Sequence, residues 1–290
     1  MTASDLRGFH DGELAVQQRA GVRRAADRLE GMLDAPALDG GAGRFLGERT
    51  FAALTAHDAT GRLWTSPLTG APGFLETLGS STLRVAAGPG VGDPLHALPA
   101  GQPVGMIAIE FSRRRRFRVN GTLTAVGEDL LVEVDQAYGN CPQYIHPRVL
   151  ETGAPGDVAR GRRGDGLDAQ DTALIGRADT FFLGTVHPER GADASHKGGP
   201  AGFVRVEDER TLWWPDYAGN NMFNSLGNLV VDPAVALLFV DFTTGATLQL
   251  SGTARLDWHT DPDVEGGTGR RVVVRVDAVS RDGRVPLRAA

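Results

Sequence analysis

Short apolar runs separated by turn residues fill most of the chain from residue 49 onward. Several of these runs alternate apolar and polar positions, which is typical of strands with one buried face. They predict hairpins or strands at residues 51–68, 73–86, 104–111, 117–126 and 271–276. Tight turns between short strands are typical of a barrel or sandwich. We therefore expect a mainly β fold with flanking helices (α+β).

Helical patterns flank these strands. Residues 11–33 predict a first helix that begins at an Asp11 cap and lies over the barrel. The glycine-rich run at 40–43 is expected to break the chain. Residues 135–145 predict a strand end, a turn and a short helix, and residues 168–175 predict a helix capped by its first residue.

The β-pattern of the first half recurs in the second half. Three blocks align without gaps: 51–61 with 181–191, 66–85 with 195–214, and 104–123 with 235–254. Their offsets are 130, 129 and 131 residues, so the blocks keep nearly one spacing. Self-similarity at a fixed spacing marks repeated structural units. The chain is therefore expected to hold two β-barrel-like units.

The repeat and the composition of the intervening segments give domain boundaries. We expect an N-terminal helical segment at 1–40, a first unit at 41–152 and a second unit at 168–290. The polar, glycine-rich residues 153–167 are expected to link the two units.

The second repeat contains a segment, residues 193–229, that has the chemistry of an anion site. We expect a loop with one base, formed by small residues and Lys197, and then a strand at 211–214 that leads into residues 215–221 and an apolar helix. Amides and small side chains at such a strand–loop–helix junction can hold a phosphate group. The loop residues are Ser195, His196, Lys197, Gly198 and Gly199. The first repeat has lost the histidine and the lysine at this position, which favours a site in the second repeat.

Composition and charge exclude several classes of protein. The formal net charge is −6, which argues against a nucleic-acid binder, and no apolar run approaches the length of a membrane helix. A single cysteine, Cys141, excludes an internal disulfide and indicates a reducing compartment, so we expect a cytoplasmic protein. Neither a metal-binding motif nor a nucleophile elbow, Walker or dinucleotide-binding motif occurs, so no metal site or catalytic residue is assigned.

In the second repeat, WPDYAGNN is followed by a helix that ends in DP, and then by LLFVDF and LQLSGTARL. This order of motifs resembles the pyridoxamine 5'-phosphate oxidase-like superfamily. The blocks GRLWTSPLTGAPGFL, RRFRVNG and YGNCPQYI resemble a long tandem-repeat subgroup of that superfamily. The resemblance implies two tandem FMN-binding split β-barrel units related by a pseudo-twofold axis. It also implies FMN as the cofactor and an oxidoreductase activity.

The resemblance assigns the FMN phosphate to the strand end and helix start of the second repeat. Asn220 and Asn221 stand where the true oxidases carry a basic pair, so compensation is expected from other groups. Thr247 or Gln249 is the nearest match for the family's strand glutamine at the flavin ring. The expected cofactor-binding residues are Ser195, His196, Lys197, Arg205, Trp214, Pro215, Asp216, Gly219, Asn220, Asn221, Thr247, Gln249, Arg116, Arg118 and Asn140.

Several of these residues also have a structural interpretation. Asn220 and Asn221 are possible helix caps, and Trp214 is either a wall for the flavin or a core residue. Arg116 and Arg118 share one strand face, which either lines the cleft between the repeats or is a solvated edge. Cys141 is expected to be a half-buried structural thiol. The repeated histidines, His57 and His187, indicate turn structure rather than catalysis.

The expected partner is a small-molecule redox substrate, with NAD(P)H as a candidate reductant, and neither nucleic acid nor membrane. We expect a monomeric pseudo-dimer or a homodimer. Two alternatives remain open on sequence grounds. One is a flavin-binding carrier or sensor without turnover, and the other is the same fold binding haem or a deazaflavin.

Overall fold

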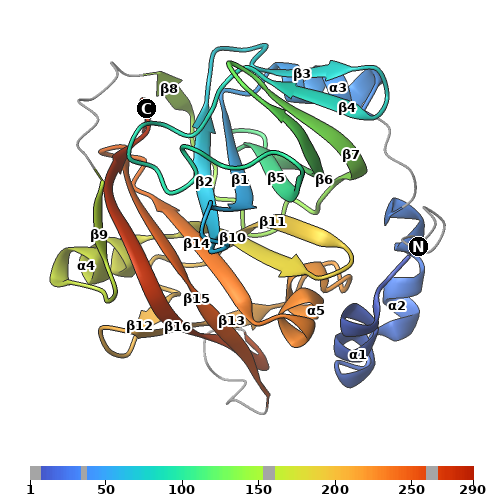
Figure 1. Ribbon diagram of the computed structural model, residues 1–290. Coiled ribbons are helices and arrows are strands. Elements are labelled where there is room, and N and C mark those ends of the chain that lie inside the picture. Colours follow the sequence, from blue (N-terminus) through green and yellow to red (C-terminus); the bar gives the residue numbers. More distant parts are fainter. Residues whose placement is uncertain (1–7, 34–37, 153–160, 259–266) are drawn as a thin grey trace.

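The computed structural model describes residues 8–33, 38–152, 161–258 and 267–290 (Figure 1). The first unit holds the strands β1 (Phe51–His57), β2 (Leu63–Thr69), β3 (Leu75–Leu78), β4 (Thr82–Val85), β5 (Gln102–Glu110), β6 (Arg115–Val126) and β7 (Leu130–Gly139). The second holds β10 (Thr180–His187), β11 (Gly191–Gly198), β12 (Arg205–Val206), β13 (Thr211–Tyr217), β14 (Ala234–Val240), β15 (Ala246–Trp258) and β16 (Gly267–Arg284). The helices are α1 (Asp11–Arg19), α2 (Arg23–Asp27), the 3₁₀ helix η1 (Glu30–Leu33), α3 (Gly40–Gly47), α4 (Ala169–Arg177) and α5 (Asn224–Val231).

The two sheets have the same strand order. The first is β2-β1-β5-β6-β7-β4-β3 and the second is β11-β10-β14-β15-β16-β13-β12, with all the paired neighbours antiparallel. Each strand of the first sheet thus has a counterpart in the second. The expected pair of tandem split-barrel units is confirmed. Figure 1 shows the first unit, in blue to green, stacked on the second, in yellow to red.

The register of the strands corrects the first alignment block. The strand pairs β1–β2 and β10–β11 place Leu54 opposite Ser66 and Leu183 opposite Ser195. The equivalent of Leu54 is therefore Leu183, at an offset of 129 residues rather than 130. A slip of one residue exchanges the two faces of a strand. The predicted equivalence of His57 and His187 was therefore wrong.

Three apolar clusters account for the burial of the strands. One fills each barrel, and a third lies between the units and draws on both of them. In this third cluster the rings of Phe51 and Phe182 lie 5.2 Å apart, centre to centre. The central strands β10 and β14 therefore bury both faces, which explains why β14 is apolar throughout rather than alternating.

The N-terminal segment differs from the single helix predicted at 11–33. It forms α1, α2 and η1, and the chain turns between α1 and α2 at Gly21, whose φ is +71°. The segment packs closely on α5, where a Cβ on Gly12 would overlap the Gly227 carbonyl oxygen and a Cβ on Gly227 would overlap the Glu13 backbone. The N-terminal segment therefore lies on the element that begins at the candidate site.

Other predicted elements are partly corrected. The glycine run at 40–43 does not break the chain but begins α3, because Phe45 and Leu46 anchor that helix in the first barrel. The short helix expected before residue 145 is absent from this described stretch, which forms a turn. Asp168 caps α4 through a reciprocal capping box, as predicted, and the helix extends to Arg177.

Two short pairings join the ends of the units. Of the expected linker at 153–167, residues 153–160 lie outside the described residues. Residues Arg162–Gly164 form β9, which pairs with β16. At the C-terminus β17 (Leu287–Ala289) pairs with β8 (Leu150–Thr152). Within the described ranges, no helix is long and apolar enough to cross a membrane.

Equivalent glycines at two β-bulges give a prediction about stability. Gly121 on β6 and Gly252 on β15 lie at register shifts, and a Cβ on either would overlap a carbonyl oxygen of the neighbouring strand. We expect Gly121→Ala or Gly252→Ala to lower the free energy of unfolding by about 2 kcal/mol or more. The reason is that the new Cβ meets the backbone of a paired strand, which cannot move aside as a flexible side chain can. Gly176→Ala is the control, since no atom lies within 4 Å of its Cβ position. Denaturant titrations in which all three variants are equally stable would contradict this account.

Candidate functional site

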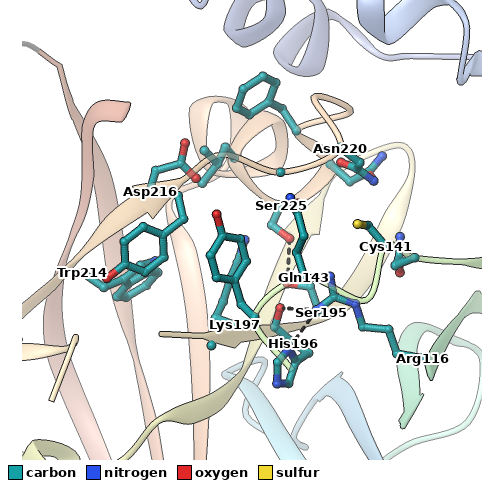
Figure 2. Close-up of a pocket in the computed structure, with 18 of the residues that line it drawn as sticks. Arg116, Cys141, Gln143, Ser195, His196, Lys197, Trp214, Asp216, Asn220 and Ser225 are labelled. Atoms are coloured by element: carbon teal, nitrogen blue, oxygen red, sulfur yellow. Dashed lines mark hydrogen bonds between the residues drawn. The ribbon is translucent and has the colours of Figure 1, made fainter. Parts of the chain in front are cut away.

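A cavity of about 130 Å³ lies between the two units (Figure 2). We call it the inter-unit cavity. The first unit contributes β6 and the segment after β7, and the second contributes β11, the end of β13 and the start of α5. All of the predicted cofactor-binding residues except Arg205, Thr247 and Gln249 line it. The structure thus brings together side chains from both repeats.

The segment expected to be a loop around Lys197 is a strand. Residues Gly191–Gly198 form β11, the edge strand of the second sheet. Successive side chains of a strand point to opposite faces. The side chains of Ser195 and Lys197 therefore point toward the cavity, while the His196 ring packs against Phe111 and Phe182 of the inter-unit core. Small polar residues gave this strand a loop-like composition, although both of its faces are largely buried.

Arg118 is fixed by a buried ion pair. Its Nη1 lies 2.9 Å from Asp193 Oδ1 and donates to the Tyr138 hydroxyl at 3.1 Å. Asp193 also accepts from Asn120 and from Ser225. Burial disfavours the charge of Arg118, but the Asp193 carboxylate and the Tyr138 hydroxyl outweigh it and raise the pKa of Arg118. The Arg118 guanidinium therefore stays positively charged, and the Asp193 carboxylate balances its charge.

Arg116 has no such counterpart among the described residues. Its Nη1 donates to His196 Nδ1 at 2.8 Å and to the His196 carbonyl at 3.2 Å, and its buried Nε has no partner. Burial and the neighbouring Arg118 lower the pKa of Arg116 to about 10. Burial, together with the neighbouring Arg116 and Arg148, lowers the pKa of His196 well below its usual value, so this ring is neutral. Arg116 therefore directs an uncompensated positive charge at the cavity.

Lys197 is a second uncompensated cation. No carboxylate of the described residues lies within ion-pair distance of its Nζ. The carboxylate that most raises the pKa of Lys197 is that of Asp216, which pairs instead with Arg270 at 2.8 Å. Burial lowers the pKa of Lys197, and Arg118 and Arg116 lower it further, while Asp216 opposes them. The site thus holds positive charges close together, and a bound anion would reduce the repulsion between them.

Hydroxyl and amide groups lie beside these cations. The Ser195 hydroxyl is 3.0 Å from that of Ser225, at the first turn of α5. Asn220 and Asn221 line the cavity, but they do not cap the helix as one interpretation had it. Helix α5 begins only at Asn224, and Asn220 Oδ1 accepts from Met222 N at 3.1 Å in a turn that precedes it.

Aromatic rings form one wall of the cavity. Tyr144 and Tyr217 stack with ring centres 5.2 Å apart and planes 23° apart, and Phe223 lies on the same rim. Trp214 borders the cavity but belongs to the barrel core, where it meets Phe181 edge-on at 4.9 Å. Sequence reasoning missed Tyr144, Tyr217 and Ser225, although they belong to motifs that it quoted. Cys141 also lines the cavity and is half-buried, as expected.

Thr247 and Gln249, both predicted to bind the cofactor, lie elsewhere. They line a counterpart cavity, also of about 130 Å³, on the opposite side of the pseudo-twofold axis. At the repeat offset of 131 residues, Thr247 corresponds to Arg116 and Gln249 to Arg118. Each unit therefore presents this strand face to a different cavity, and the structure does not bring Thr247 and Gln249 to the inter-unit cavity. Arg205, on β12, contributes to neither cavity.

The counterpart cavity lacks the cations of the inter-unit cavity at every equivalent position. Pro67 and Leu68 replace His196 and Lys197, while Ser66 retains the hydroxyl of Ser195. Gln249 donates to Ser66 at 2.9 Å and to the buried Asp93 carboxylate at 3.0 Å, closing one wall. Burial raises the pKa of Asp93, a sign that negative charge is disfavoured there. Arg281 and Arg284 also line this cavity. Arg281 is paired with the Asp171 carboxylate, to which its Nε donates at 2.7 Å, and Arg284 donates to the Thr244 carbonyl at 3.4 Å. The counterpart cavity thus differs from the inter-unit cavity in the number and the position of its charges.

Comparison with known proteins gives one family match. Residues 167–282 match the family model described as pyridoxamine 5'-phosphate oxidase. No curated protein matches the chain at a significant level. No group of three or more His, Cys, Asp or Glu side chains in the described part of the chain is placed to hold a metal ion.

Solved structures match the chain over about two fifths of its length. One is a protein related to general stress protein 26, of the pyridoxinephosphate oxidase family, from Clostridium acetobutylicum; it is 14% identical, covers 42% of this chain and 91% of its own, and has a TM-score of 0.30. The haem storage protein HutZ from Vibrio cholerae is 11% identical, with coverages of 41% and 96% and a TM-score of 0.30. An F420 reductase is 18% identical, with coverages of 37% and 93% and a TM-score of 0.28.

Proposed function

We propose that this chain, whose residues 167–282 match the family model described as pyridoxamine 5'-phosphate oxidase, is an FMN-dependent oxidoreductase whose flavin phosphate lies in the inter-unit cavity. The observation that carries the proposal is the pair of uncompensated cations, Arg116 and Lys197, beside the Ser195 hydroxyl. Charge-assisted contacts from such groups are the strongest hydrogen bonds that a phosphate receives.

The charge of the cavity suits a dianion. Arg118 is balanced by Asp193 and Asp216 by Arg270, which leaves two positive charges without a counterpart among the described residues. A phosphate monoester carries nearly two negative charges at neutral pH. The buried Nε atoms of Arg116 and Arg118 have no partner, so each has a donor to offer. The residues present therefore fit the phosphate end of FMN.

The aromatic wall suits the ring of the flavin. Tyr144, Tyr217 and Phe223 lie on the rim of the cavity, where a planar ring can stack on them. Bound FMN supplies the ability to accept and return a hydride, while the protein supplies binding, orientation and electrostatics. The role of this chain is then to hold the phosphate at Arg116 and Lys197 and to present the ring beside the tyrosines.

We propose one flavin per chain. The inter-unit cavity takes walls from both repeats, so a single chain completes it as a monomeric pseudo-dimer. The counterpart cavity has threonine, glutamine, proline and leucine where the inter-unit cavity has two arginines, histidine and lysine. Haem is less well suited, because the His196 ring is covered by Arg116 and by the inter-unit core.

The absorbance spectrum and mass of the ligand that co-purifies test this proposal. We expect the spectrum of an oxidised flavin, the mass of FMN and bleaching of the flavin by NADH or NADPH. A Soret band would indicate haem, and the mass of a deazaflavin would indicate that cofactor; either result would contradict FMN. A flavin that no reductant bleaches and no acceptor reoxidises would indicate a carrier or sensor instead.

A further inference from the structure

A small polar cavity of about 20 Å³ lies behind the inter-unit cavity, beneath α1. We call it the α1 cavity. Its walls come from α1, β6, β7, β11 and α5, and they include Glu13, Tyr138 and Asp193. Asn224 lines both cavities, so its amide separates them. A group at α1 can thus act on the candidate anion site through a single side chain.

Glu13 is held in the α1 cavity by hydrogen bonds. Glu13 is only 3% exposed. Its carboxylate accepts hydrogen bonds from the His10 amide, at 2.9 Å, and from Asn224 Nδ2. The other amide atom of Asn224, Oδ1, lies 3.4 Å from Arg118 Nη1 and accepts from it. A continuous path of polar contacts therefore runs from Glu13 through Asn224 to Arg118.

His10 does not neutralise Glu13. Its Nε2 is 3.5 Å from Glu13 Oε2, but that nitrogen donates to Asn228 Oδ1, while Nδ1 accepts from the Gly12 amide. The Asn228 amide nitrogen donates to Thr185, which fixes its oxygen as the acceptor for His10. The ring is therefore a neutral tautomer, and burial and His187 lower its pKa to about 4.

Burial dominates the titration of Glu13. It raises the pKa of Glu13 to about 7, with Asp193 adding to the rise and with the His10 amide, Asn224 and Arg190 opposing it. The charged or titratable groups that face Glu13 are His10 at the N-cap of α1, His187 and Arg190 at the β10–β11 hairpin, Asp193 on β11, Arg118 on β6 and Tyr138 on β7. Among Glu13 and these neighbours, Glu13 is the group that changes charge close to neutral pH.

We infer that Glu13 is a positioning residue of the anion site, which orients the Asn224 amide and takes up a proton when a dianionic ligand binds. This inference rests on the proposed binding of FMN in the inter-unit cavity. An ionised Glu13 accepts from the Asn224 amide nitrogen and so turns the amide oxygen toward Arg118. A protonated Glu13 instead donates to that oxygen, so the amide presents its NH₂ group to the inter-unit cavity. Protonation thus adds a donor and removes a negative charge behind the ligand.

The sign of the linkage follows from these charges. A dianion in the inter-unit cavity favours the protonated form of Glu13 and raises its pKa further. FMN should therefore bind more tightly at pH 6 than at pH 8.5 in the unaltered protein. A rise of one unit in the pKa of Glu13 corresponds to an uptake of about 0.5 proton per FMN at pH 7.5. The free phosphate is already largely dianionic at that pH, since its second pKa is about 6.

Calorimetric titration with FMN at pH 7.5, in two buffers of different ionisation enthalpy, measures this uptake. We expect the unaltered protein to take up several tenths of a proton more than Glu13→Gln, which has no titratable group there. Any uptake by Lys197 is common to both proteins and cancels in the difference. The control is Asp27→Asn, an exposed acid of the same segment that pairs with Arg23, and it should behave as the unaltered protein does.

The possible results distinguish the inference about Glu13 from the proposal that FMN binds in the inter-unit cavity. Equal proton uptake in the unaltered protein and Glu13→Gln, with FMN bound by both, would overturn the role of Glu13 and leave the FMN site standing. Failure of the unaltered protein to bind FMN would overturn both. Should Glu13→Gln not fold, infrared difference spectra of the unaltered protein provide the test. A protonated carboxyl band must then appear on FMN binding, and its absence would contradict the inference.

Discussion

Affinity for FMN falls by about a hundredfold to ten-thousandfold when Arg116 and Lys197 are both replaced by alanine. Each side chain offers a charge-assisted contact worth about 1.5–3 kcal/mol, which corresponds to about tenfold to hundredfold in affinity. Neither has a carboxylate partner within ion-pair distance among the described residues, so neither replacement strands a buried negative charge. The change should therefore appear in binding rather than in folding, and fluorescence titration with FMN measures it.

Matched controls for this double variant come from the chain itself. Thr247→Ala alters the pseudo-twofold equivalent of Arg116 in the counterpart cavity. Arg113→Ala removes an exposed arginine from the hairpin that leads into β6. Both should bind FMN as the unaltered protein does. If the double variant binds FMN as tightly as these controls, the cations do not hold the phosphate.

The lysine offers a second readout of the same prediction. Lys197 is the only lysine in the sequence, so apart from the α-amino group it is the only primary amine that an acylating reagent can modify. Bound FMN should protect it, and peptide mass spectrometry distinguishes its label from that of the α-amino group. Undiminished labelling of Lys197 in the presence of saturating FMN would contradict its contact with the phosphate.

Replacing Asp193 by alanine should lower the free energy of unfolding by about 3–5 kcal/mol, because it leaves the Arg118 guanidinium buried without its counter-charge. The change also removes the acceptor shared by Asn120 and Ser225. Chemical denaturation followed by tryptophan fluorescence measures the loss.

Asp27→Ala is the reference for that measurement. The pair between Arg23 and Asp27 joins two side chains that are each about two fifths exposed, so its loss should cost no more than about 1 kcal/mol. Equal costs for the two variants would mean that the Arg118–Asp193 pair is solvated rather than buried.

Local pattern was sufficient to predict much of the fold. The hairpins at 51–68 and 73–86 and the strand pair at 104–126 were predicted because apolar runs and turn residues are local signals. The repeat predicted two units of equal topology. The first block was nevertheless aligned one residue out of register, because apolar identity does not record which face a residue presents.

The candidate site was harder to predict because it is formed by residues distant in sequence. Arg116 and Lys197 are 81 residues apart in sequence and meet only because the units stack. The composition of β11 resembled a loop, since its burial comes from the opposite unit rather than from its own apolar residues. Thr247 and Gln249 line a different cavity from Arg116 and Lys197, because a pseudo-twofold axis presents equivalent strand faces to two different cavities. Only the packing of the units distinguishes these cavities.

Titration of the unaltered protein with FMN and, separately, with riboflavin tests the central claim most directly. The two ligands share the isoalloxazine ring and differ in the phosphate that the site is proposed to hold. We expect FMN to bind at least about a hundredfold more tightly, which corresponds to the contribution of one or two charge-assisted contacts, with one FMN per chain. Equal affinity for both ligands, or two FMN molecules per chain, would contradict the account.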